Sequence, residues 1–127
     1  MTAMIDLPVE EIPSLHHDEA MTLAEAEYAR LLALADALSP DDWLRPTDCT
    51  GWSVRDVVGH VLGMVELQAD PAEQRRQIGI AAERARESGE LRLTELTALQ
   101  VREHAHLTTT ELRAALHEAT GSPRGGR

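Results

Sequence analysis

Apolar residues recur at helical spacing along most of the chain. Ala35 and Leu38 share one face of a helix predicted over residues 18–38. Farther along, a stripe of valines centred on Val61 and Val65 predicts a second amphipathic helix. Strict alternation of apolar and polar residues, the pattern of a half-buried strand, does not occur. The pattern therefore predicts an all-α fold.

Capping signals divide the rest of the chain into helices. Ser53 with Asp56, and Thr108 with Glu111, have the spacing of capping boxes. The Asp-Pro step at residues 70–71 is another helix start, and a glycine at position 89 is a stop signal. These signals predict helices over residues 53–69, 71–88, 91–107 and 108–120, and a single turn over residues 39–44.

The length and composition indicate one small folded domain. The chain has 127 residues, of which 43% are hydrophobic and 27% charged, as is typical of a globular protein. We expect the domain to span residues 18–120, between a flexible N-terminal segment at 1–17 and a flexible tail at 121–127. There is no Phe. We therefore predict a core made mainly of aliphatic side chains, in which Trp43 and Trp52 are the large residues that fill the remaining space.

Charge and cysteine content exclude several classes of protein. Twelve basic and 22 acidic residues give a net charge of -10. This charge argues against binding to nucleic acid or to an anionic membrane surface. No apolar run is long enough to span a membrane, and we expect a cytoplasmic protein. The single cysteine, Cys49, cannot form an internal disulfide and is expected to be inert.

His60 is the first candidate for a functional residue. It lies on the flank of the apolar arc of its helix, neither deep in the core nor in the middle of the solvent-exposed face. Two interpretations remain open for this position. A metal ligand at the mouth of a helical bundle would lie here, and so would a surface histidine that packs only the edge of its ring.

The residues around His60 carry a resemblance to a known family. Asp-Trp-Leu-Arg-Pro-Thr at 42–47 and Gly-Trp-Ser-Val-Arg-Asp-Val-Val-Gly-His-Val at 51–61 resemble the N-terminal signature of the mycothiol-dependent maleylpyruvate isomerase family. That family belongs to the DinB-like superfamily of metal-binding four-helix bundles. The resemblance extends more weakly over residues 18–120. It implies a DinB-like up-down helical bundle, here incomplete at the C-terminal end.

The resemblance implies a role for each matched residue. His60 would be the first ligand of a divalent metal, typically zinc, on the second helix of the bundle. Trp52 would fill the corner where the loop enters that helix, Ser53 would cap the helix and Asp56 would support the cap. In the family, an acidic residue and a second histidine four residues later complete the metal site. The metal would activate the thiol of mycothiol, a small-molecule cofactor.

The sequence departs from the family at the remaining ligands. After residue 60 no Asp or Glu is followed four residues later by a histidine. The residues that precede the later histidines at this spacing are Gln100, Arg102 and Arg113. The catalytic residues are therefore unassigned, and we expect the first part of such a protein or a shortened relative. A makeshift site of His60, Glu103 and His104 is one possibility. The alternatives are a hydrogen-bonded core histidine at position 104, or a helix that faces the missing half of the protein.

Two functions are compatible with these observations. The first is a divalent metal-binding helical domain that supports thiol-dependent isomerase or transferase chemistry in the full-length form, with mycothiol as the thiol. The second is a non-catalytic helical module that buries its apolar faces against a partner or a second copy, as in a homodimer. Metal content discriminates between them. With one assigned ligand, this chain alone is expected to bind zinc weakly or not at all.

Overall fold

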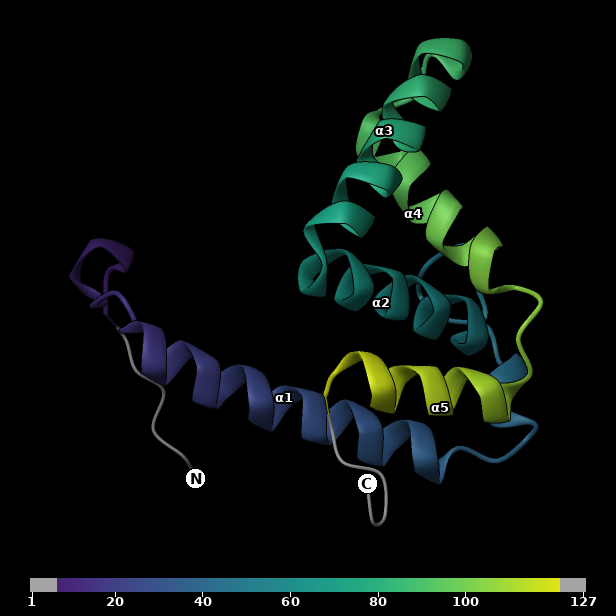
Figure 1. The fold of residues 1–127 in the computed structure, drawn as a ribbon. Helices are drawn as coiled ribbons and strands as arrows, with labels where there is room; N and C mark the ends of the chain where they lie inside the picture. The colour runs from purple at the N-terminus through teal and green to yellow at the C-terminus, as the bar shows by residue number, and fades with distance from the viewer. Residues whose placement is uncertain (1–6, 122–127) are drawn as a thin grey trace.

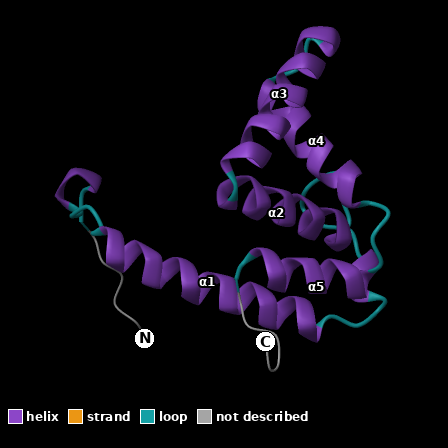
Figure 2. Ribbon diagram, in the orientation of Figure 1, coloured by secondary structure: helices purple, strands orange, loops and turns teal. Residues whose placement is uncertain are grey.

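The structure is a computed structural model that describes residues 7–121. Every regular element in this range is a helix, as Figure 2 shows, and the predicted all-α fold is confirmed. The α-helices are α1 (His17–Ala37), α2 (Val54–Ala69), α3 (Pro71–Ser88), α4 (Arg92–His104) and α5 (Thr109–Ala119). Two short 3-10 helices, η1 (Val9–Glu11) and η2 (Asp42–Leu44), precede α1 and α2 respectively.

The predicted capping boxes are both present. Ser53 Oγ accepts from the Asp56 amide at 3.3 Å, and Asp56 Oδ2 accepts from the Ser53 amide at 3.0 Å. Thr108 and Glu111 form the same reciprocal pair at 3.1 and 2.9 Å. Each pair provides acceptors for amides that have no partner within the first turn of a helix. The starts of α2 and α5 are therefore local consequences of the sequence.

The end of α4 differs from the prediction. The helix was expected to run to residue 107 and instead ends at His104. Arg55 Nη2, from α2, donates to the carbonyls of His104 at 3.3 Å and Ala105 at 2.8 Å, and also to that of Leu107. An arginine thus satisfies carbonyls that lack helical partners at this end, as basic side chains commonly do.

The two terminal segments fall largely outside the described residues. Residues 1–6 of the segment expected to be flexible are not described, and within its remainder η1 forms one turn. Of the expected tail, only Gly121 is described. Within the described range, no helix is both long and apolar enough to cross a membrane.

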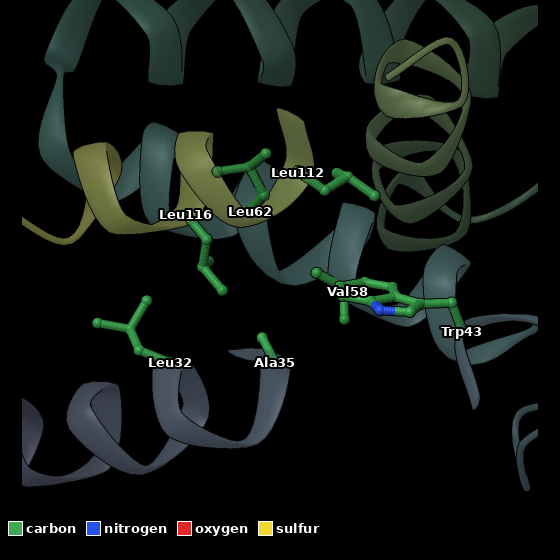
Figure 3. Packing of buried hydrophobic residues seen from close by; sticks show 7 residues of the cluster. All are labelled: Leu32, Ala35, Trp43, Val58, Leu62, Leu112 and Leu116. Carbon is green, nitrogen blue, oxygen red and sulfur yellow. The ribbon is translucent and has the colours of Figure 1, made fainter. Parts of the chain in front are cut away.

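Helix α2 lies at the centre of the fold. It packs against α3, α4, α5 and η2, whereas α1 lies beside α5 (Figure 1). The α3–α4 pair projects from α2 on the side opposite α1 (Figure 1). Between α1, α2, α5 and η2 is a core cluster, shown in Figure 3, that consists of Leu32, Ala35, Trp43, Val58, Leu62, Leu112 and Leu116. The core is therefore aliphatic around one tryptophan.

The two tryptophans have different environments. Trp43 is only 1% exposed and packs in the core, as predicted. Trp52 is partly buried and lies outside this cluster. Of the two residues at the expected centre of the apolar face of α2, Val65 is buried as predicted, whereas Val61 is only partly buried and Val58 and Leu62 are buried beside it.

A second face of α2 is buried as well, and the valine pattern did not predict it. Gly59, Gly63 and Leu67 are buried along this face. A Cβ atom at Gly63 would come within 2.5 Å of Gln100 Cγ on α4. Helix α4 can therefore approach α2 closely only because this position has no side chain. His60 lies one residue from this glycine face, and that places it beside α4.

Candidate functional site

The loop that enters α2 is held by backbone and side-chain hydrogen bonds. Thr47 donates to the Trp52 carbonyl from both its amide, at 3.1 Å, and its hydroxyl, at 3.0 Å. The Val54 amide donates to the Arg45 carbonyl at 2.9 Å. Gly51 has a φ of 83°, a conformation that glycine adopts readily. The Pro-Thr and Gly-Trp steps of the motif therefore shape the loop.

His60 lies directly beside this loop. The centroids of its ring and of the Trp52 ring are 5.7 Å apart, with the ring planes at 47°. Its Nδ1 atom is 2.7 Å from Gln100 Oε1. Within residues 7–121, His60 Nε2 makes no hydrogen bond, and it is not among the buried polar atoms that lack a partner. His60 Nε2 is therefore open to solvent or to a ligand.

Two buried glutamines lie behind His60. Gln77 is 1% exposed and Gln100 is 0% exposed. Gln100 Nε2 lies 2.9 Å from Gln77 Oε1, and Gln77 Nε2 lies 3.1 Å from the Gly63 carbonyl oxygen. From the sequence, Gln100 was noted only for its spacing from His104, and Gln77 was given no role. The one available signal for Gln77 was its place one turn before the buried Ala81 on α3.

His104 belongs to a separate ion pair. Its Nε2 lies 2.8 Å from Glu66 Oε1, and its Nδ1 lies 2.7 Å from the Gln100 carbonyl oxygen. Because a carbonyl only accepts, Nδ1 is a donor, and the carboxylate then favours a proton on Nε2 as well. The hydrogen bond to Glu66 is the main cause that raises the pKa of His104, ahead of the bond to Gln100.

The makeshift site of His60, Glu103 and His104 is not formed. Glu103 binds the Arg76 guanidinium through both carboxylate oxygens, at 2.7 and 2.8 Å. The hydrogen bond from Arg76 holds the pKa of Glu103 below its usual value. Both nitrogens of His104 are already occupied. The alternative, a hydrogen-bonded histidine between packed helices, agrees with the structure.

The described residues do not make a complete metal site. Across residues 7–121, no group of three or more His, Cys, Asp or Glu side chains is arranged to hold a metal ion. A zinc site normally has three or four protein ligands. His60 fits as one such ligand, since its Nε2 is accessible and its Nδ1 is held by an acceptor.

The structure also has a groove of about 590 Å³. It is formed by the end of α2, the start of α3 and the C-terminal half of α5, and His60 is not among its lining residues. Four carboxylates line it: Glu66, Asp70, Glu73 and Glu118. Among them, Glu66 pairs with His104 and Glu73 pairs with Arg76.

Comparison with known families agrees with the motif around His60. The family described as mycothiol maleylpyruvate isomerase N-terminal domain matches residues 24–124, which include the entry loop, His60 and both buried glutamines. Neither the curated proteins nor the solved structures gave a match. The family match covers well over half of the chain. The chain therefore belongs to the mycothiol maleylpyruvate isomerase N-terminal domain family.

Proposed function

We propose that this domain supplies His60 Nε2 as one ligand of a divalent metal site, with zinc as the metal. The site would support thiol-dependent isomerase or transferase chemistry, with mycothiol as the thiol. One observation carries the proposal: Nδ1 is held by Gln100 Oε1 at 2.7 Å while Nε2 remains open. Metal-binding histidines almost always hold their other ring nitrogen in this way.

The site would need further ligands, because within residues 7–121 His60 belongs to no group of three or more His, Cys, Asp or Glu side chains that could hold a metal ion. A metal held at such a site lowers the pKa of a coordinated thiol and raises its thiolate fraction. The role of the chain's own residues is to orient the imidazole. By itself, the chain is expected to bind zinc weakly or not at all.

The experiment is a zinc titration of the chain, followed by calorimetry and by NMR of the imidazole nitrogens. We expect weak binding in which the His60 Nε2 signal changes first. His60→Ala should abolish this component. A double variant, His16→Ala with His17→Ala, is the matched control, because it removes two exposed histidines at the start of α1. The control should retain the His60 signal change.

Two outcomes would contradict the assignment of His60. One is tight one-to-one binding that persists in His60→Ala. The other is zinc binding that leaves the His60 Nε2 signal unchanged. Removal of His60 also leaves the buried Gln100 Oε1 without its partner, at a cost of about 1–3 kcal/mol. Denaturant unfolding must therefore confirm that His60→Ala is folded under the conditions of the titration.

A second candidate function is a non-catalytic module that pairs with a second copy of itself. Large apolar side chains are exposed along the N-terminal part of the structure: Leu7, Val9, Ile12, Leu15, Met21 and Leu23. The N-terminal half of α1 extends away from α2 and α5 (Figure 1). Light scattering across a concentration series tests this candidate. A monomer at all concentrations would contradict it, and a zinc-independent dimer would support it.

A further inference from the structure

Three side chains and one backbone carbonyl form a continuous series of hydrogen bonds that is buried except at His60, which is partly buried. It runs from the Gly63 carbonyl through Gln77 and Gln100 to His60, with distances of 3.1, 2.9 and 2.7 Å. Among the described residues, Gln77 and Gln100 are the two polar residues that are buried. Burial of two uncharged amides is unfavourable unless each polar atom has a hydrogen-bond partner, and these hydrogen bonds provide the partners.

The chain of hydrogen bonds has only one possible direction. A backbone carbonyl accepts and never donates, so the group of Gln77 facing Gly63 is its Nε2 amide. Gln77 Oε1 therefore faces Gln100 and accepts from Gln100 Nε2. This arrangement turns Gln100 Oε1 toward His60, and an amide oxygen also only accepts. His60 Nδ1 must then carry a proton.

A separate contact agrees with this direction. Gln100 Nε2 also lies 3.2 Å from the sulfur of Met64, which is a weak acceptor and has no proton to donate. An amide nitrogen with two hydrogens satisfies both Gln77 and Met64, whereas an amide oxygen in the same place would satisfy neither. The orientation of Gln100 is thus fixed from two sides.

We infer that Gln100, itself oriented by Gln77, is a positioning residue that holds neutral His60 as its Nδ1–H tautomer. In this tautomer the free electron pair is on Nε2, the nitrogen that has no partner within residues 7–121. A free electron pair on Nε2 would bind an electron-pair acceptor, and we assign a divalent cation to this position. That last step rests on the proposed function of His60, whereas the tautomer follows from the hydrogen bonds alone.

The test is NMR of the full chain labelled with ¹⁵N at histidine, above about pH 8, where an ordinary imidazole is neutral. Long-range nitrogen–proton correlations distinguish the two tautomers. We expect wild-type His60 to be predominantly Nδ1–H. Gln100→Met, of similar shape but with only a weakly accepting sulfur in place of the amide oxygen, should give a mixture dominated by the opposite tautomer.

Two further variants separate positioning from folding. Gln74→Met alters an exposed glutamine of α3 and should leave the tautomer unchanged. The double variant Gln77→Leu with Gln100→Met removes both buried amides together, so that no buried side-chain amide is left without its hydrogen-bond partner. It should remain folded by circular dichroism and still lose the Nδ1–H preference.

Zinc titration of the same samples tests the link to the cation. The zinc concentration that half-saturates the His60 signal should rise about 10–100-fold in Gln100→Met. A wild-type His60 in the Nε2–H form, or a tautomer indifferent to Gln100→Met, would overturn the positioning role. If the Nδ1–H form depends on Gln100 but zinc never contacts Nε2, the positioning role stands and the metal assignment of His60 fails.

Discussion

Gly63 on α2 lies against the side chain of Gln100 on α4, so closely that a Cβ at position 63 would come within 2.5 Å of Gln100 Cγ and 2.7 Å of its Cβ. One turn earlier, a Cβ at Gly59 would be 3.4 Å from His104 Cβ, an ordinary contact. Of these two glycines, Gly63 is therefore in the closer contact with α4. This contact brings the Gln100 amide within reach of His60 and Gln77.

Gly63→Ala should destabilise the fold, because the added methyl group has no space between α2 and α4. We expect a loss of about 1–3 kcal/mol in the free energy of unfolding. Gly79→Ala is the matched control, since a Cβ at Gly79, also within a helix, would meet nothing within 4 Å. There the higher helix propensity of alanine should stabilise by about 0.5–1 kcal/mol. Denaturant unfolding measures both, and equal effects would contradict this account of the helix contact.

Trp43→Ala should cost about 3–5 kcal/mol, the usual range for removing a large buried aromatic side chain. Trp43 is 1% exposed and packs in the core cluster. Trp52→Ala should cost less, because Trp52 is only partly buried and lies outside that cluster. Urea denaturation of the two variants gives the comparison. A larger loss for Trp52 would show that the entry loop contributes more stability than the core does at this end of α2.

Arg55→Ala should destabilise the end of α4. Its guanidinium donates to the carbonyls of His104, Ala105 and Leu107, and a hydrogen bond that involves a charged group contributes about 1.5–3 kcal/mol. Hydrogen exchange should show faster opening of the last turn of α4. Arg75→Ala, which alters an exposed arginine of α3, should change stability by less than about 0.5 kcal/mol. Unchanged hydrogen exchange in the last turn of α4 in Arg55→Ala would contradict the capping role of Arg55.

The His104–Glu66 pair should make stability depend on pH. Because the hydrogen bond to Glu66 raises the folded-state pKa of His104, the folded protein binds this proton more tightly than the unfolded chain does. The stabilisation is complete below the unfolded pKa of about 6.5 and is lost as the pH rises through the folded value.

His104→Gln removes the titrating group at that position. The stability difference between wild type and His104→Gln should be larger at about pH 6 than at about pH 8.5, since only the lower pH keeps His104 protonated in both states. Urea unfolding at the two pH values measures this difference. A difference that grows as the pH rises would have the opposite sign and would contradict the ion pair.

Much of the local structure follows from the sequence. Ser53 and Thr108 begin α2 and α5 as predicted, because a capping box joins residues only three apart. Gly89 ends α3 for an equally local reason. Trp43 reaches the core because it is the large apolar side chain of a turn next to an aliphatic face. The resemblance around residues 42–61 also identified the family and singled out His60.

Only the tertiary structure decided how His60 is held. Its partner Gln100 is 40 residues away, and Arg55 reaches carbonyls 49 to 52 residues away. These contacts depend on the approach of α4 to α2 at Gly63, and a glycine adds nothing to an apolar stripe. Helical periodicity detects apolar side chains, which are driven out of water. The face of α2 that contains Gly59 and Gly63 has no such side chains at these positions, so it could be recognised only from the packing of α4 against α2.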